Sequence, residues 1–379
     1  MTRLPRRLHP GAWWLWAIGL AAAASQTTNP LVLLLFCAVA WCVVAMRRGD
    51  APWANGFRFY VVLGLVIIAV RVAFRIVFGE AGAGETVLFE LPELALPDAA
   101  GGIQIGGPVT LEGILGALYD GLRIATLLLC LGAANVLADP KRLLKALPGA
   151  LYEVGVAVTV ALTMAPQLIV SGQRIRRARR LRGDLGGRRH VVRTALIPVL
   201  EDALDSSLVL ASSMDSRGYG RTAGVPRTTR IVTAVLVLAG LAGVCVGTYG
   251  LLDATTPRQL GLPMLMVGCV LAIAGLRLGG RRVRRTVYRP DRWRWEETAV
   301  IACGVGAAAL MVLADAVDPG NLYPTLQPLR WPELGLIPAI AAAVGVLPAI
   351  VAPPPRSSMR KPDAAPEPSR SERLLVGAP

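Results

Sequence analysis

The chain has 379 residues, of which 54% are apolar and 17% charged, and its mean hydropathy is +0.53. A soluble globular protein averages about 45–50% apolar and about 25% charged residues. Here the apolar residues gather in blocks that approach the roughly 20 residues an α-helix needs to cross about 30 Å of hydrocarbon. The composition excludes a soluble globular protein and predicts a membrane protein.

The formal net charge of +15 suggests a nucleic-acid-binding protein at first sight. Phosphate binding needs an exposed basic face, whereas the basic residues of this chain lie between its apolar blocks. Lys and Arg in the cytoplasmic loops of membrane proteins show that pattern. We therefore expect the lipid bilayer as a partner, and no nucleic acid.

Eight apolar blocks are predicted to be transmembrane helices, four on each side of a basic middle region. In chain order they cover Gly11–Ala24, Leu31–Met46, Phe59–Phe78, about 111–138, about 231–252, 262–276, 299–316 and 334–351. The predicted fold class is an all-α polytopic membrane protein with a central cytoplasmic helical module. The regions are residues 1–138 (about four helices), 139–228 (the module), 229–352 (about four helices) and 353–379, a Pro-rich charged tail expected to be disordered.

The charges of the loops predict the topology. The basic N-terminus, Arg47-Arg48 and the segment Asp139–Arg142 are expected inside, and the acidic segment 79–108, which has no Lys or Arg, is expected outside. The arginine-rich loop 277–294 and the tail also belong inside. Two helices between successive basic landmarks satisfy this pattern and place both termini in the cytoplasm.

One further apolar block, Tyr152–Val170, disturbs this count because basic segments flank it on both sides. A single crossing would move one basic cluster outside, which the positive-inside rule disfavours. We expect the block to be re-entrant or to lie along the membrane–cytosol boundary, with Pro166 supplying a kink or a break.

The sequence has no pattern typical of a metal site or of a common enzyme. The six cysteines lie in apolar stretches without a CxxC pair, and His9 and His190 are far apart, so neither metal nor cofactor is expected. No GxxxxGK[ST], HExxH or GxSxG occurs. An acidic cluster in the middle region, Glu201, Asp202 and Asp205, is expected to balance arginines or to face solvent.

A secondary transporter that carries its own substrate remains an alternative. Such proteins place ionisable residues within their spans, and the candidates here are Arg71, Arg75, Asp120 and Arg123. All lie near span ends or in the long fourth helix, where packing roles are expected. No inverted repeat is evident.

Two Arg-Gly pairs end helical stretches in the middle region. The first closes the run Arg174–Gly183, and the second lies in Met214-Asp215-Ser216-Arg217-Gly218-Tyr219. Gly directly after a helix is a common stop because it accepts positive φ. An Arg before it can offer its guanidinium to a carboxylate.

These motifs resemble the transmembrane T component of energy-coupling factor (ECF) transporters, the EcfT/CbiQ family. That family has two Ala-Arg-Gly-type motifs at the ends of cytoplasmic coupling helices. Residues 214–219 are similar to its Met-x-Ala-Arg-Gly-Tyr pattern, while Leu181 stands where the first motif usually has Ala. The segments beginning at Asn135 and at Met164-Ala-Pro-Gln are similar too, and the resemblance covers about residues 10–225.

The resemblance implies a non-catalytic scaffold of an ECF-type ABC importer for a vitamin or a transition metal ion, in the inner membrane. Its partners would be two cytoplasmic ABC ATPases and a small substrate-binding membrane S component. The implied ATPase-coupling residues are Arg182, Gly183, Ser216, Arg217 and Gly218. The implied supporting residues are Arg179, Arg180, Met214, Asp215 and Tyr219.

Overall fold

The structure is a computed structural model. It describes residue 6 and residues 8–49, 56–78, 86–95, 104–146, 151–181, 188–218, 227–252, 257, 260–280 and 293–354. The chain forms two compact units. The first comprises Met1–Leu143 and Arg289–Pro379, and the second comprises Leu144–Tyr288. The predicted tail lies almost entirely outside the described residues.

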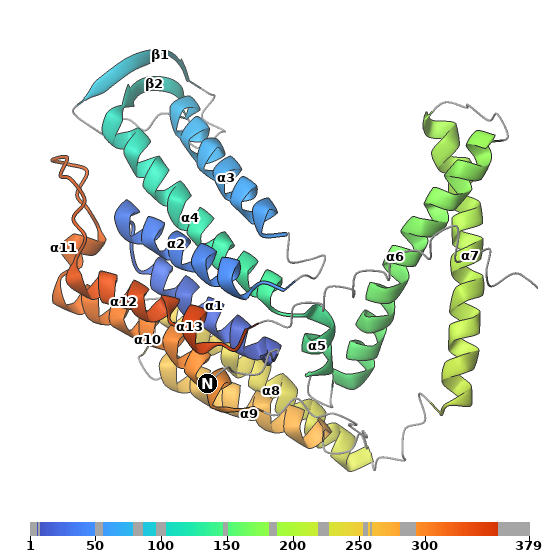
Figure 1. Ribbon diagram of the computed structural model, residues 1–379. Coiled ribbons are helices and arrows are strands. Elements are labelled where there is room, and N and C mark those ends of the chain that lie inside the picture. The colour runs from blue at the N-terminus through green and yellow to red at the C-terminus, as the bar shows by residue number, and fades with distance from the viewer. Residues whose placement is uncertain are drawn as a thin grey trace, which may run out of the picture. The chain divides into compact units, whose positions relative to one another are not determined.

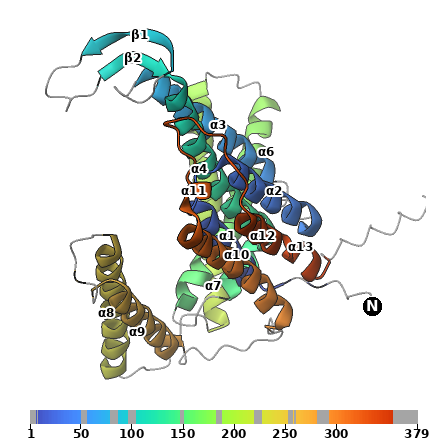
Figure 2. The same cartoon turned by 90° about the vertical axis from the view of Figure 1, so that its left-hand side faces the viewer.

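The first unit is a bundle of six helices that come from both ends of the sequence (Figures 1 and 2). Their bounds are α1 (Pro10–Ser25), α2 (Pro30–Arg47), α3 (Phe57–Val77), α4 (Leu111–Leu137), α10 (Trp295–Val317) and α12 (Leu336–Val346). The short helices α5 (Pro140–Lys145), α11 (Pro319–Leu322) and α13 (Pro348–Val351) follow α4, α10 and α12. Each predicted span of this unit therefore contains a helix, with ends shifted by a few residues.

Helices α1 and α2 begin where the sequence supplies a cap followed by proline. His9 Nδ1 accepts a hydrogen bond from the Gly11 amide at 3.1 Å, and Asn29 Oδ1 accepts one from the Leu31 amide at 3.0 Å. The prolines after these caps lack an N–H at a position where the helix has no carbonyl to offer it. Local chemistry thus sets both helix starts.

The core of the first unit lies between α1, α2, α4, α10 and α12. Trp16, Leu20 and Phe36 are fully buried in it. Helix α1 crosses α10 at Gly19 and Gly304, where a Cβ on Gly19 would come within 2.5 Å of the Gly304 backbone. Close approach through small residues is typical of helix packing in membranes. The C-terminal helices α10 and α12 therefore complete a core that the N-terminal helices begin.

One end of the first unit holds the start of α1, the end of α4 and the start of α10. Arg6 Nη2 donates to Glu297 Oε1 at 2.8 Å, which ties the segment before α1 to α10. Arg142 Nη1 donates to the Leu8 carbonyl at 3.2 Å, which brings the residues after α4 to the same place. The chain thus leaves the first unit after α4 and re-enters it at α10 on the same side. We call this the basic end.

The opposite end holds the turn between α1 and α2 and the segment after α10. Thr27 Oγ1 donates to the Leu322 carbonyl at 2.8 Å. Asn29 Nδ2 donates to the carbonyls of Asn321 and Glu333 at 2.7 and 2.8 Å. Both Thr27 and Asn29 are fully buried, so these bonds satisfy polar groups that would otherwise be costly to bury.

A β-hairpin also lies at this opposite end, between α3 and α4 (Figure 2). Strand β1 (Val87–Ala95) pairs antiparallel with β2 (Gln104–Thr110), and the register is irregular at two places. Thr86 Oγ1 donates to the buried Glu112 at 2.7 Å, which fixes the hairpin to the start of α4. The membrane part is all-α, as predicted. The segment 79–108 was expected only to lie outside the membrane, and a hairpin there was not predicted.

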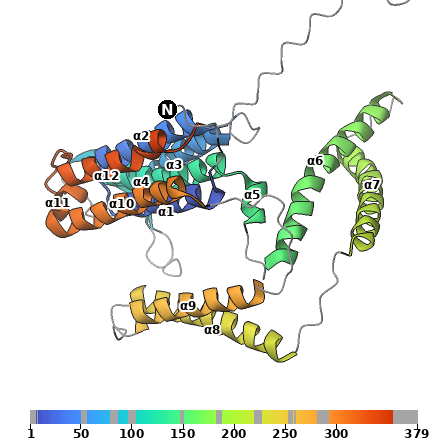
Figure 3. The ribbon, with the colours of Figure 1, turned by 60° about the horizontal axis from the view of Figure 1, so that its bottom comes forward.

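The second unit contains α6 (Tyr152–Leu181), α7 (Arg188–Ser216), α8 (Arg227–Leu252) and α9 (Leu262–Gly280). Helices α8 and α9 lie side by side (Figure 3) and approach closely at glycines. A Cβ on Gly240 or Gly247 would come within 2.4 Å of the α9 backbone, at Ala272 and Leu265. The outer faces of this pair are apolar and exposed, as lipid-facing helices require.

Of the kink or break expected at Pro166, the break does not occur, because α6 continues through this residue from Tyr152 to Leu181. Among the described residues, seven helices are long and apolar enough to cross a membrane. They are α2, α3, α4, α8, α9, α10 and the segment Val154–Ala178 of α6. Helix α1, of 16 residues, and the apolar stretch Leu336–Val351 are shorter. The chain is a multi-pass membrane protein.

Candidate functional site

The second Arg-Gly motif forms the C-terminal end of α7. Helix α7 ends at Ser216, the Arg217 amide donates to the Met214 carbonyl at 3.1 Å, and the Gly218 amide donates to the Asp215 carbonyl at 2.9 Å. Gly218 has φ +76, a left-handed conformation that residues with a Cβ rarely adopt. The predicted glycine stop is confirmed at this position.

The side chains at this helix end are largely exposed. Met214 is half-buried, whereas Asp215, Ser216 and Arg217 are exposed. The last carbonyls of a helix carry partial negative charge, so a cation such as Arg217 is favoured there. The end of α7 therefore presents an accessible arginine, Arg217, at a defined position.

The first motif lies only partly within the described chain. Arg179 and Arg180 belong to the last turn of α6, and the structure describes their backbone. Arg182 and Gly183, and Tyr219 of the second motif, lie outside the described residues. The roles assigned to these residues stay predictions.

A hydrogen bond joins α6 to α7. Ser171 is 7% exposed, and its Oγ donates to Asp202 Oδ2 at 2.6 Å. Beside it, a Cβ added to Gly172 would lie 3.9 Å from a methyl carbon of Val199, which is an ordinary van der Waals distance. Sequence reasoning placed Asp202 in an acidic cluster but did not find this bond, because no local pattern pairs residues 31 positions apart. The bond gives the α6–α7 pair a defined crossing point.

Helix α7 is long and presents an apolar face. It begins at Arg188 and ends at Ser216, so the described second motif lies at its C-terminal end. At 1.5 Å per residue, the 29 residues of α7 span about 43 Å. Between the two ends α7 exposes Ile197, Leu204 and Leu208, which share one helix face. Helix α7 thus has an accessible C-terminal end and an exposed apolar face.

The ionisable residues weighed for rival functions have structural partners. Arg71 Nη2 lies 3.2 Å from Asp120 Oδ2, and Arg123 donates to the Ser25 carbonyl at the end of α1. Within the described part of the chain, no group of three or more His, Cys, Asp or Glu side chains could hold a metal ion.

Comparison with known families identifies the chain's class. The sequence profile described as CbiQ, cobalt transport protein, matches residues 1–229, which include both Arg-Gly motifs and helices α1 to α7. The chain belongs to the CbiQ family. The suspected resemblance is confirmed, and this CbiQ-family protein is a membrane component of a transport system. No curated protein matches the chain in a sequence search.

The match ends at residue 229, just inside the start of α8. Helices α8 to α13 therefore extend beyond the matched region. Two of them, α10 and α12, nevertheless pack against α1 and α2 in the first unit (Figure 1).

Proposed function

We propose that this CbiQ-family protein is the transmembrane scaffold and energy-coupling subunit of an ECF-type ABC importer for a vitamin or a transition metal ion. Cobalt is the cargo that the family description names. The observation that carries the proposal is the end of α7, where Gly218 stops the helix directly after the exposed Arg217. In this proposal Arg182 and Arg217 each bind a groove on one cytoplasmic ATPase.

The proposed contact has a clear physical basis. An Arg guanidinium offers five donors in a planar fork that matches a carboxylate, and the contact strengthens when partner surfaces exclude water. Glycine after the arginine lets a partner's surface approach the helix end without meeting a side chain.

The first unit supports the proposed cytoplasmic location of residues 139–228. The chain leaves and re-enters that unit at the basic end, and an even number of bilayer crossings by residues 144–288 would agree with this. Helices α8 and α9 supply two crossings. Helix α7 carries Glu201, Asp202 and Asp205 at its centre, which makes it a costly span. A single crossing by α6 would break parity, so α6 and α7 stay on the cytoplasmic side, as do both termini.

The chain itself is proposed to be non-catalytic. No phosphate-binding GxxxxGK[ST] loop occurs in the sequence, so ATP hydrolysis belongs to the two ATPases. Their closure would move α6 and α7, and through them a small S component that binds the substrate in the bilayer. The rival secondary transporter gains no support, because Arg71, Asp120 and Arg123 make contacts within the bundle.

The proposal is tested by recruitment of the ATPases. Tagged chain is purified with its ATPases from cells that carry Arg182→Ala, Arg217→Ala or both substitutions. Loss of one partner in a buried charged contact costs about 2–5 kcal/mol, so each variant should bind the ATPases at least about tenfold more weakly. Arg217→Ala should be the more damaging, because Arg179 and Arg180 stand close to Arg182.

Arg227→Ala is the matched control, since this exposed arginine of the same unit belongs to neither motif. It should recruit the ATPases normally. If the double variant still recruits both ATPases and supports uptake, the coupling role is refuted.

A further inference from the structure

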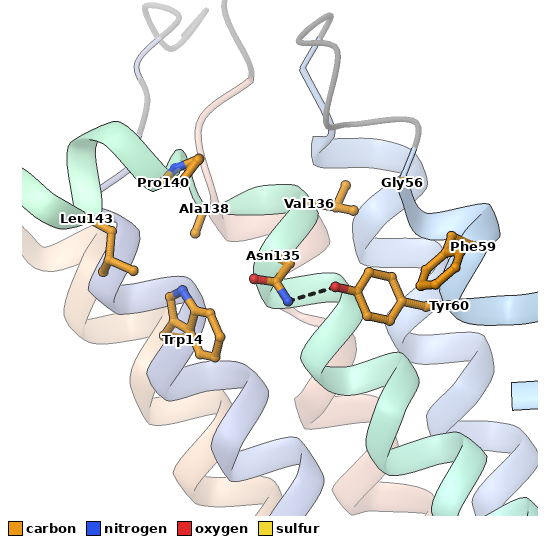
Figure 4. Close-up of a pocket in the computed structure, with 9 residues that line it drawn as sticks. All are labelled: Trp14, Gly56, Phe59, Tyr60, Asn135, Val136, Ala138, Pro140 and Leu143. Carbon is orange, nitrogen blue, oxygen red and sulfur yellow. Dashed lines mark hydrogen bonds between the residues drawn. The ribbon is translucent and has the colours of Figure 1, made fainter. Parts of the chain in front are cut away.

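We propose that a groove at the basic end of the first unit binds one anionic phospholipid, with an acyl chain in the groove and the phosphate at Arg58 and Lys141. The groove is an open hollow with a volume of about 440 Å³ between α1, α3, α4 and α5. Figure 4 shows Trp14 and Leu143 on one side and Phe59 and Tyr60 on the other, with Asn135 between them. This function is separate from ATPase coupling.

The floor of the groove is held in place by specific contacts. Asn135 Nδ2 donates to Tyr60 Oη at 2.9 Å, which joins α4 to α3. The Tyr60 ring lies against Gly132, where any Cβ would come within 2.5 Å of it. Glycine at 132 thus leaves the space that the ring occupies, and the ring in turn forms one wall. The groove is a built feature of the α3–α4 pair.

The composition of the groove favours a lipid over a protein segment. Its walls are mainly apolar and aromatic, the residue types that gather where a bilayer meets water. Its volume falls in the range of small-ligand pockets, whereas a docked helix would need a channel about 10 Å wide. An acyl chain satisfies both conditions.

The charge around the groove favours an anionic headgroup. Exposed Arg58 precedes the lining residue Phe59, and exposed Lys141 follows the lining residue Pro140. Arg142 adds positive charge to the same short helix, α5, and the carboxylate of Asp139 lies directly before that helix. Basic pockets between membrane helices bind anionic headgroups at the cytoplasmic surface. A zwitterionic lipid would gain less from these cations.

The test uses the fluorescence of Trp14 in the full-length protein, reconstituted into vesicles. Bromine on acyl chains quenches nearby tryptophan, and the difference between the parent and Trp14→Phe isolates the Trp14 signal. Brominated phosphatidylglycerol should quench this signal at about 25-fold lower mole fraction than brominated phosphatidylcholine, since each of the two basic residues adds roughly a factor of five.

The Arg58→Gln, Lys141→Gln double variant should remove this preference while keeping the groove. Arg330→Gln is the matched control, because Arg330 is exposed at the opposite end of the same unit. Equal quenching of Trp14 by both lipids in the parent protein would overturn the proposal. The proposal would also be overturned if neither brominated lipid quenched Trp14 and the protein ran as a dimer. A second copy of the chain would then be the occupant of the groove.

Discussion

Glu297 is a fully buried carboxylate at the start of α10. Its Oε1 accepts from Arg6 at 2.8 Å and from the His9 amide at 3.3 Å, and its Oε2 accepts from the Arg294 amide at 3.0 Å. One side chain thus caps its own helix and holds the segment before α1. A buried charge needs such partners, because an unpaired one is strongly destabilising.

We expect Glu297→Gln to lower the free energy of unfolding by about 1–3 kcal/mol, because Arg6 then loses the closer of its two ionic partners. Thermal unfolding of the detergent-solubilised protein measures this as a lower midpoint. Glu296→Gln serves as the control, since Glu296 lies 3.8 Å from Arg6 and caps nothing. Equal midpoints for the two variants would show that Glu297 has no special role.

Gly218 allows a second test at the scale of single residues. Its φ of +76 disfavours any Cβ, yet a Cβ there would meet nothing within 4 Å. Gly218→Ala should therefore cost about 1 kcal/mol of backbone strain without steric crowding, and weaken ATPase binding several-fold. Gly218→Asn should bind better than Gly218→Ala, because Asn tolerates this conformation. Equal binding by both variants would argue that the helix-end geometry is unimportant.

At the scale of elements, the crossing of α1 and α10 depends on two glycines. A Cβ on Gly304 would come within 2.7 Å of Trp16 Cα, and one on Gly19 would meet the Gly304 backbone. Backbone atoms cannot rotate away as a flexible side chain can. The two helices would have to separate, which would also strain the bond from Trp16 Nε1 to the Gly345 carbonyl.

Gly304→Ala is expected to destabilise the bundle by about 1–3 kcal/mol through overpacking. Gly306→Ala on the same helix is the matched control, because its Cβ would make only an ordinary contact with Val344 at 3.5 Å. Thermal unfolding of both variants in detergent checks the prediction. A Gly304→Ala protein as stable as the control would mean that α1 and α10 pack less closely than described.

Sequence reasoning found the helices because an apolar block of roughly 20 residues has one good solution in a bilayer. It missed the β-hairpin because Pro92, Gly106, Gly107 and Pro108 are residues that argue against a strand. Here the hairpin is held from outside its own segment, by Thr86 and Glu112. Pro166 does not interrupt α6 for a related reason, since proline disfavours a helix without forbidding one.

For the molecule as a whole, the sequence predicted where helices form but not how they group into two units. Gly19 and Gly304 allow α10 to pack closely against α1. The sequence does not distinguish these two glycines from the many others in the chain, so this contact could not be predicted. The end of α7 was predictable because Arg-Gly is a local signal that Gly218 fulfils. The Ser171–Asp202 bond was not, because it depends on how two helices cross.

The proposed topology predicts which single cysteines a membrane-impermeant thiol reagent can reach. In a cysteine-free background, residues 145 and 185 should react only from the cytoplasmic side, and residue 90 in the β-hairpin only from outside. Uptake by each variant serves as the control for folding. Labelling of residue 145 or 185 only from outside would overturn the parity argument and with it the proposed position of α6 and α7.

The packing of α10 and α12 into the N-terminal bundle has a consequence for biogenesis. Roughly 150 residues separate the end of α4 from the start of α10, and at about 5–20 residues per second a ribosome needs some 8–30 s to make them. During that interval the buried faces of Trp16 and Leu20 have no α10 or α12 to cover them. Newly made α1 to α4 therefore lie in the bilayer with part of their packing surface uncovered. Lipid, insertion factors and proteases can reach that surface. A ribosome that stalls within the second unit would leave an orphaned half-bundle for quality control to remove.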